Sequence, residues 1–468
     1  MPESIRLPPA RLCFCRGRIN APQHPLLQSF NGWNRLWFHR TEYVQIHEDT
    51  NLGEDIARQL RWKVPVSEPT LPLAEPHAIR HEAGMIRGAH ISPDDSPQPK
   101  LLLVGGGHAH VAVLADWIRN GPPPPGGAAR LRTLLLTPHP TLRYSGMVPG
   151  WLAGQHARDQ GLVDLAALAA RAGAVWVQGR CVALDPQARV VHTETGETIT
   201  FDLASFDTGG VGRGHAVLGD DPRLIDIRPI DAFVARIAAR PAPRRVVVAG
   251  GGAGGVELAF GLRNLASAEA RPEVVLATGA AGLLPGFSQA VRKRVARAQA
   301  RQGIMVIAED ARLADGAIMA GNRSLEPADL IVAALGSAAP DWVRESGLAV
   351  DDAGFALVDR HQRSCSHPHI FVAGDVAARA DLALAHSGVH AVFAGPVLAA
   401  NLRKLLAGEP PRRSYQPRWN SLYLMNTGDG SAIASYGRLA AQGAFVLRLK
   451  HWIDKRWIAQ YAALAGTA

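Results

Sequence analysis

Cysteine is scarce in this sequence, with four residues in 468, at Cys13, Cys15, Cys181 and Cys365. None of them forms a C-x-x-C or C-x4-C pair, so a dithiol mechanism for reducing disulfides is excluded. Cys13 and Cys15 have no second cysteine pair nearby, and we predict no metal site. The low cysteine content also excludes a disulfide-stapled secreted scaffold and favours the reducing cytoplasm.

Long apolar runs are missing as well. No segment reaches the ~18 consecutive apolar residues that a membrane-spanning helix needs, and residues 1–20 lack the pattern of a signal peptide. The formal net charge is +9, and residues 401–468 hold ten Lys and Arg against three Asp and Glu. This basic end is consistent with a solvated surface or with peripheral contact on the inner face of a membrane. No nucleic-acid-binding motif accompanies the charge, so we predict no nucleic-acid partner.

The first of two glycine-rich loops follows an apolar run at Leu101–Val104, which predicts a buried strand. Apolar residues at helical spacing resume after the glycines. A strand, a glycine turn and a helix together can hold a pyrophosphate, because backbone amides approach it closely and the helix N-terminus is electropositive. His110 stands where the G-x-G-x-x-G pattern has its third glycine. The residues expected at the phosphates are Gly105, Gly106, Gly107, His108 and Ala109.

A second loop repeats the arrangement after the apolar run Val246–Ala249. Here Gly250, Gly252 and Gly255 fill all three glycine positions. Glu257 is the first charged residue of the helix that follows. Two roles stay open for it, a contact with a nicotinamide or a favourable charge near the helix N-terminus, and we favour the contact.

A third signal is the apolar strand that ends at Gly374 and Asp375. A carboxylate there can accept hydrogen bonds from the ribityl hydroxyls of a flavin. Two dinucleotide loops followed by such a strand are typical of flavoproteins with one site for FAD and one for NAD(P)H. The sequence therefore predicts an α/β protein with two Rossmann-like dinucleotide-binding domains and a small C-terminal region.

The expected domain boundaries follow from these signals. The stretch before the first loop lacks strands and glycine loops and is an extension of uncertain order; Met85 is an alternative natural start. Helices are expected over residues 163–172 and 385–401. The domains are the extension (1–97), the FAD-binding domain (98–230 and 337–400), the NAD(P)H-binding domain inserted into it (231–336) and the C-terminal region (401–468).

Two features usual in such domains are missing at strand ends. Thr137 stands where a carboxylate would hold the adenosine ribose. Ala277, Thr278 and Gly279 follow the corresponding strand of the second domain, so the choice between NADH and NADPH stays open. The loop from Tyr144 to Gly150 either borders the flavin or is a simple turn.

The segment Arg448–Tyr461 is amphipathic, with Trp452 and Trp457 among its apolar residues and basic residues around them. Such a helix either lies on a membrane surface or packs on the body of the protein. We favour packing.

From about Lys100 onward the chain resembles the pyridine nucleotide-disulfide oxidoreductase superfamily. Within it, Val104–Val111, Tyr144–Gly150 and Leu449–Asp454 are similar to the flavoprotein domain fused ahead of selenide, water dikinases; type II NADH:quinone dehydrogenases are more distant. The resemblance implies FAD at Gly105, Gly107 and Asp375, and NAD(P)H at Gly250, Gly252 and Gly255. The chain departs from its relatives at Leu384–His386, where they tend to have Pro-x-Lys, and at Phe393, where they often have Arg.

These expectations converge on an FAD-dependent oxidoreductase that passes electrons from NAD(P)H to a quinone-like or other acceptor, the redox chemistry being that of the cofactor. One alternative is a sulfide:quinone-type enzyme, for which Cys181 and Cys365 are the candidates inside the domains. Another is a flavin-binding partner of a selenide, water dikinase without NAD(P)H turnover.

Overall fold

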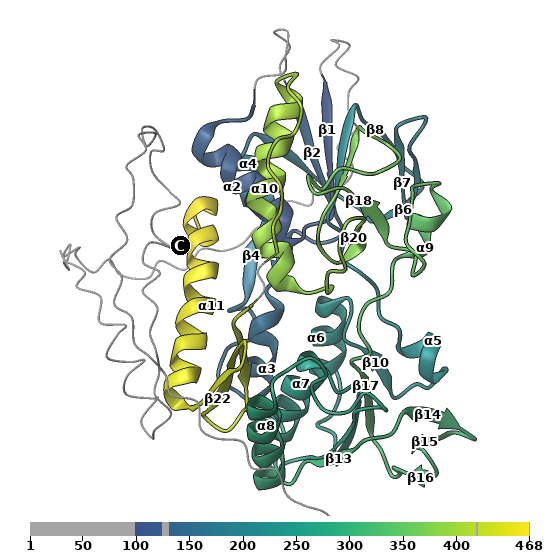
Figure 1. The fold of residues 1–468 in the computed structure, drawn as a ribbon, viewed down its shortest axis with the longest axis vertical. Coiled ribbons are helices and arrows are strands. Elements are labelled where there is room, and N and C mark those ends of the chain that lie inside the picture. The colour runs from purple at the N-terminus through teal and green to yellow at the C-terminus, as the bar shows by residue number, and fades with distance from the viewer. Residues whose placement is uncertain (1–98, 124–130, 418–419, 468) are drawn as a thin grey trace, which may run out of the picture. The chain divides into compact units, whose positions relative to one another are not determined.

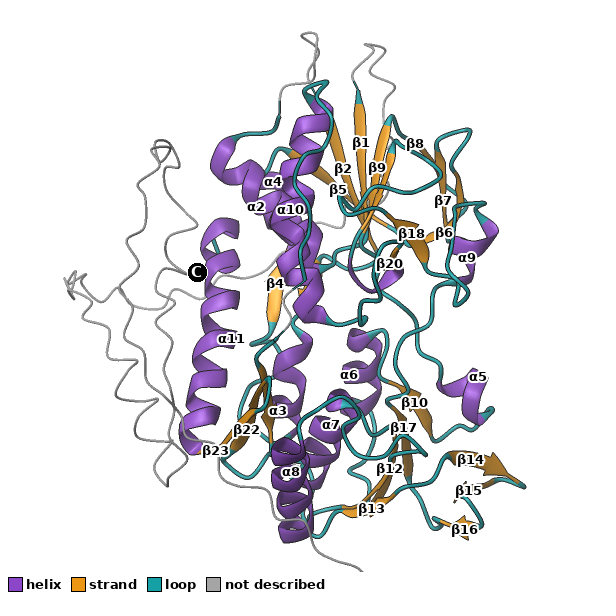
Figure 2. Ribbon diagram, in the orientation of Figure 1, coloured by secondary structure: helices purple, strands orange, loops and turns teal. Residues whose placement is uncertain are grey.

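The computed structural model describes residues 99–123, 131–417 and 420–467. The extension expected over residues 1–97 lies outside the described residues. The described part is built around two five-stranded parallel sheets flanked by helices (Figure 1, Figure 2). The α/β prediction with two Rossmann-like sheets is confirmed.

The first sheet has β1 (Lys100–Val104) as its central strand, in the order β19-β9-β1-β2-β5 with parallel neighbours. Leu101 and Leu103 face the layer of helices, while Leu102 and Val104 face the opposite layer, because successive side chains of a strand alternate between faces. All four are buried. The other strands are β2 (Arg132–Thr137), β5 (Ala174–Gln178), β9 (Leu203–Phe206) and β19 (Ile370–Val372).

Helices cover one face of this sheet, and short strands together with one short helix cover the other. The helices are α2 (His108–Asn120), α4 (Leu165–Arg171) and α10 (Gly388–Leu406). The other face is covered by β6 (Cys181–Asp185), β7 (Val190–Thr193), β8 (Thr198–Thr200), α9 (Asp341–Glu345), β18 (Ala356–Val358) and β20 (Ala377–Arg379).

The second sheet has the order β10-β17-β11-β12-β13, again with parallel neighbours. Val246 and Val248 of its central strand contact the helices, and Val247 and Ala249 contact the hairpin on the other side. Its strands are β10 (Leu224–Asp226), β11 (Arg245–Ala249), β12 (Glu273–Ala277), β13 (Met305–Ile307) and β17 (Leu330–Ala333). Around it lie α5 (Gly214–Leu218), α6 (Ile230–Ala238), α7 (Ala253–Arg263), α8 (Gln289–Gln302), β14 (Ala311–Ala314), β15 (Ala317–Ala320) and β16 (Arg323–Ser324).

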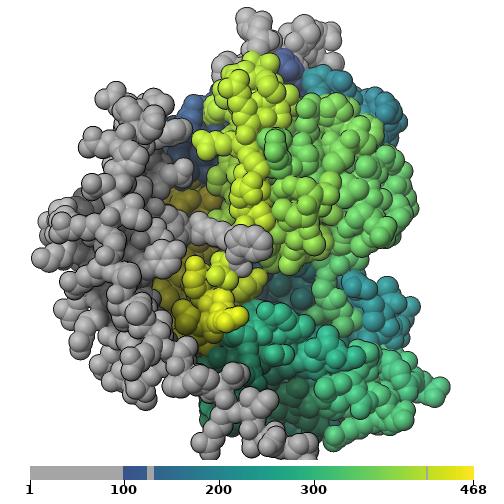
Figure 3. All heavy atoms as spheres, viewed as in Figure 1, coloured from purple at the N-terminus to yellow at the C-terminus, as the bar shows by residue number. Residues whose placement is uncertain are grey.

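The C-terminal segment contacts both halves. It consists of an antiparallel sheet, β21 (Tyr423–Asn426), β22 (Ala432–Tyr436) and β23 (Leu439–Gly443), followed by α11 (Ala444–Ala465). Met425 and Ile433 join the core of the second sheet. On the surface, the yellow atoms of the C-terminal segment adjoin the teal atoms of the second half (Figure 3). Tyr461 and Ala465 join the helical core of the first sheet. No helix in the described ranges combines the length and apolar character that crossing a membrane requires.

Two helix boundaries differ from those expected. Val163 belongs to the short strand β4 (Leu162–Asp164), paired with β3 (Thr141–Arg143), and α4 begins only at Leu165 because the Asp164 carboxylate caps it by accepting from the Ala167 N–H at 2.8 Å. The helix α10 begins at Gly388 and continues to Leu406, whereas a helix over residues 385–401 was expected. Between β3 and β4 lie the one-turn helices η2 (Ser145–Met147) and α3 (Val148–Leu152).

Candidate functional site: a cavity between two glycine loops

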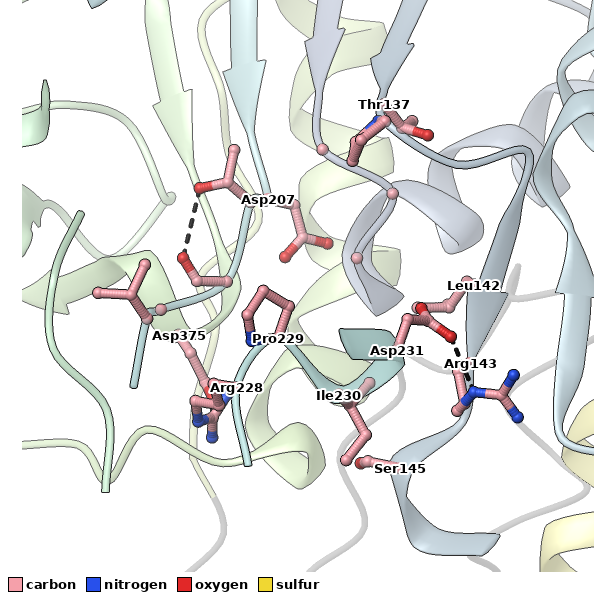
Figure 4. A pocket seen from close by; sticks show the side chains of 18 of the residues that line it. Thr137, Leu142, Arg143, Ser145, Asp207, Arg228, Pro229, Ile230, Asp231 and Asp375 are labelled. Atoms are coloured by element: carbon pink, nitrogen blue, oxygen red, sulfur yellow. Dashed lines mark hydrogen bonds and ion pairs between the residues drawn. The ribbon is translucent and has the colours of Figure 1, made fainter. Parts of the chain in front are cut away.

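A cavity of about 830 Å³ runs from the first glycine loop toward the helix of the second. Its wall includes Gly105, Asp207 and Asp375 from the first half, and Gly254 and Glu257 from α7. Figure 4 shows that Asp207, Asp375 and Arg228 lie on one side of it and Arg143 and Asp231 on another. The carboxyl ends of parallel strands meet here, as expected of ligand sites in open α/β sheets.

The first glycine loop has two features suited to a phosphate. Gly105 has φ +93°, and a Cβ there would collide with the backbone oxygen of Asp207, so glycine is required. Within the described part of the chain, the N–H groups of Gly106 and His108 have no hydrogen-bond partner, and both residues line the cavity. Two unpaired amides at the start of a helix fit a bound pyrophosphate.

A buried carboxyl occupies the rest of this helix terminus. Oδ2 of Asp207, which directly follows β9, accepts from the N–H groups of Ala109 at 2.7 Å and His110 at 3.1 Å. A Cβ on Gly107 would collide with the same carboxyl group. Burial raises the pKa of Asp207 to about 7, with Asp375 adding to the rise, while the two N–H donors oppose it. Gly107, the second glycine of the G-x-G-x-x-G pattern, therefore makes room for the Asp207 side chain.

His110 takes the position of the third glycine because its ring is fully satisfied inside the protein. Its Nδ1 lies 2.6 Å from the Gly105 oxygen and its Nε2 lies 2.9 Å from Oγ of Ser205 on β9. Burial lowers the pKa of this imidazole to about 4, so the ring is neutral at physiological pH. The small Ser205 side chain leaves the space that a glycine would otherwise provide between α2 and the sheet.

Asp375 stands at the end of β19, in the one-turn helix η3 (Gly374–Val376). Its carboxylate pairs with Nη2 of Arg228 at 2.7 Å, and both residues line the cavity. An arginine beside a carboxylate provides donors for an anion and acceptors for hydroxyls at neighbouring points, which fits the phosphates and ribityl chain of a flavin. Burial lowers the pKa of the nearby His108 to about 4 despite the charge of Asp375.

The second glycine loop differs in leaving its helix terminus open. Gly250 has φ +126°, and a Cβ on Gly255 would collide with the Gly250 oxygen, so both positions require glycine. Around Gly252 and Gly254, in contrast, a Cβ would meet no atom within 4 Å. No protein acceptor in the described ranges takes the N–H groups of residues 252–255. The open space and free amides fit a second dinucleotide.

The expected site residues are only partly brought together. Of the residues described, the cavity wall takes in Gly105, Gly106, Gly107, His108, Asp375 and Glu257. Ala109, Tyr144, Gly250, Gly252 and Gly255 lie outside this wall, and Gly374 lines a smaller neighbouring pocket. Tyr144 stacks on Trp457 of α11, with ring centroids 4.8 Å apart, so the loop that follows β3 is fixed by the C-terminal helix.

Two contacts at the cavity join residues that are far apart in the sequence, and the sequence does not reveal them. Nε of Arg143 lies 2.8 Å from Oδ1 of Asp231 at the start of α6, as the dashed line in Figure 4 shows. Arg228 comes from the segment that leads into the same helix. Each role depends on a partner far away in the chain, and no local pattern marks it.

Residues 99–391 match the family model described as pyridine nucleotide-disulphide oxidoreductase. The chain belongs to this family of flavoprotein oxidoreductases. A search of curated proteins finds no significant match. Among solved structures, the fold is similar to a sulfide:quinone oxidoreductase from Aquifex aeolicus (TM-score 0.63, 17% identity, 78% of this chain and 92% of that one). It is also similar to NDH2 of Plasmodium falciparum in complex with NADH (TM-score 0.64, 12% identity, 79% of this chain and 97% of that one). A third similar structure is a water-forming NADH oxidase from Lactobacillus brevis (TM-score 0.57, 19% identity, 73% of this chain and 75% of that one).

Proposed function

We propose that this protein is an FAD-dependent oxidoreductase that takes a hydride from NAD(P)H and passes the electrons to a quinone-like or other electron acceptor. The observation that carries the proposal is the cavity that extends from the first glycine loop, whose amides of Gly106 and His108 are unpaired among the described residues, to the helix of the second glycine loop. FAD, when bound, supplies the redox chemistry. The chain's own residues hold the two nucleotides and exclude water.

Sulfide oxidation receives less support from the residues. It would need two cysteines at the flavin, whereas Cys181 is buried in β6 with its pKa raised to about 12 by burial, and Cys365 is exposed. The similarity to a sulfide:quinone oxidoreductase is at the level of the fold. A link to a selenide, water dikinase and peripheral membrane contact through α11 stay predictions.

An anaerobic titration tests the proposal. The purified protein, reconstituted with FAD, is mixed in turn with NADH, NADPH and sulfide while the flavin absorbance is followed. Bleaching by a nicotinamide supports the proposed activity, and bleaching by sulfide alone supports the alternative. A protein that binds FAD but is bleached by none of the three would refute the dehydrogenase and favour a flavin-binding partner. Failure to bind FAD would refute both.

A further inference from the structure

Lys450 is a buried cation where α11 meets the site, with 6% of its surface exposed. Its Nζ donates to the Gly146 oxygen at 2.9 Å and lies 3.2 Å from Oδ2 of Asp454 and 3.9 Å from Oε1 of Glu257. Gly146 belongs to η2 and Glu257 to α7. One ammonium group therefore joins three segments that are distant in the sequence, and two of them, η2 and α7, contribute residues to the cavity wall.

The charges around Lys450 do not balance unless a proton is added. Glu257 and Asp454 would together carry two negative charges against one positive charge, and Asp454 is 3% exposed. A net buried charge is costly, whereas one proton shared by the two carboxyl groups makes the cluster neutral. Burial raises the pKa of both Glu257 and Asp454, and Lys450 opposes the rise.

The remaining groups that face the cluster do not supply a second positive charge. The Tyr144 hydroxyl lowers the pKa of the neighbouring Asp454 carboxyl. The Asn426 N–H donates to Oε1 of Glu257 at 2.8 Å. Burial lowers the pKa of the His156 and His451 imidazoles, whose ring centroids are 4.6 Å apart. Both rings are therefore neutral near pH 7. Lys455, the next cation of α11, is exposed.

We propose that the cluster of Glu257, Lys450 and Asp454 stores one proton, and that Glu257 delivers it from the cavity wall to the electron acceptor. The inference rests on the proposed function and assigns a role in that reaction to the C-terminal helix. Glu257 is the donor. Lys450 and Asp454 are positioning residues, since they set how firmly the proton is held and lie behind Glu257.

The stoichiometry of the reaction leaves one proton to be supplied. A quinone-type acceptor A is reduced as NAD(P)H + H⁺ + A → NAD(P)⁺ + AH₂. The hydride brings two electrons and one proton, so the second proton must come from the protein or the solvent. Glu257 gives up its proton as an O–H bond forms on the acceptor, and solvent protons then restore the neutral cluster.

Infrared difference spectroscopy tests the stored proton without turnover. Spectra of each variant are subtracted from those of the parent protein at pH 7, so that other protonated carboxyl groups cancel. We expect Glu257→Gln or Asp454→Asn to remove the carbonyl band of one protonated carboxyl, and Lys450→Met to add a second band. Lys455→Met, on the exposed side of the same helix, should change nothing. The absence of any such band in the Glu257 and Asp454 differences would overturn the proposal.

The pH profile of acceptor reduction tests delivery. Loss of the donor in Glu257→Gln should slow reduction of a soluble quinone about 100-fold, while bleaching of the flavin by NAD(P)H continues. Removing the cation in Lys450→Met should raise the pH at which acceptor reduction falls off on the alkaline side by about one unit or more. Lys450→Arg, which keeps the cation, should restore the parent profile. Equal profiles for Lys450→Met and Lys455→Met would refute delivery. Loss of bleaching in the parent protein would instead refute the proposed function, and the infrared result would still stand.

Discussion

Replacing Asp207 by Asn should make FAD binding independent of pH, whereas the parent protein should bind FAD more weakly as the pH rises. Asp207 accepts two N–H groups at the terminus where the pyrophosphate is expected, and burial raises its pKa to about 7. An ionised carboxylate beside a phosphate is repulsive, so FAD binding takes up a proton at Asp207 above this pKa. The apparent affinity should then fall about tenfold for each pH unit above 7. The neutral Asn side chain keeps the shape without the charge.

The assay is the quenching of FAD fluorescence on addition of the protein stripped of flavin, between pH 6 and pH 9. Calorimetry in two buffers of different ionisation enthalpy counts the protons taken up. Asp220→Asn is the matched control, because the side chain of Asp220 is 95% exposed, and its slope should equal that of the parent protein. Equal slopes for Asp207→Asn and the parent, or no proton uptake by the parent at pH 8, would refute the reasoning.

Three further predictions concern stability and the second nucleotide. A carboxyl whose pKa rises from 3.8 to about 7 on folding favours the folded state at low pH, and this stability is lost as the pH climbs between those values, by up to about 4 kcal/mol. Urea unfolding at pH 5 and pH 8 should show about 2.7 kcal/mol of this loss in the parent, the part that falls between pH 5 and the folded pKa, and none of it in Asp207→Asn. A parallel loss in both proteins would contradict the assignment. Gly255→Ala should displace α7 from its glycine loop and weaken NAD(P)H binding at least about tenfold with FAD binding unchanged, as anaerobic titration would show. Trp457→Ala should cost about 2–3 kcal/mol of unfolding free energy, because the Trp457 ring stacks on Tyr144 with ring centroids 4.8 Å apart. Trp452→Ala, at an exposed position, is the control and should cost under about 0.5 kcal/mol. Equal losses in the two variants would show that the stacking does not stabilise the protein.

The glycine loops could be predicted because their requirement is local. Gly105 and Gly250 lie at positive φ directly after a buried strand. The few residues on either side of each glycine are enough to predict such a turn. The same holds for the strands, whose apolar runs fill both faces of a sheet. The helix expected over residues 163–172 was misplaced at its start, since the pairing of β4 with β3 and the Asp164 cap override apolar periodicity.

Asp207 and Lys450 could not be predicted, because their roles arise from tertiary packing. Asp207 is 98 residues from Ala109, whose N–H it accepts, and its position after a strand is typical of many loop residues. The amphipathic pattern around Lys450 is the same for a helix on a membrane and for one on the protein. In the structure, Trp457 packs against Tyr144 and His108, while Trp452 on the same helix is 57% exposed.

The position of α11 has a consequence for biosynthesis. Translation proceeds from the N-terminus, and both parallel sheets precede α11 in the chain, so they can fold while the ribosome is still making residues 444–465. Until that helix emerges, Glu257 lacks its ammonium neighbour and the Tyr144 ring lacks the indole on which it stacks. Under the proposed function, a nascent chain would bind its nucleotides before the proton-donating cluster at the cavity wall is complete.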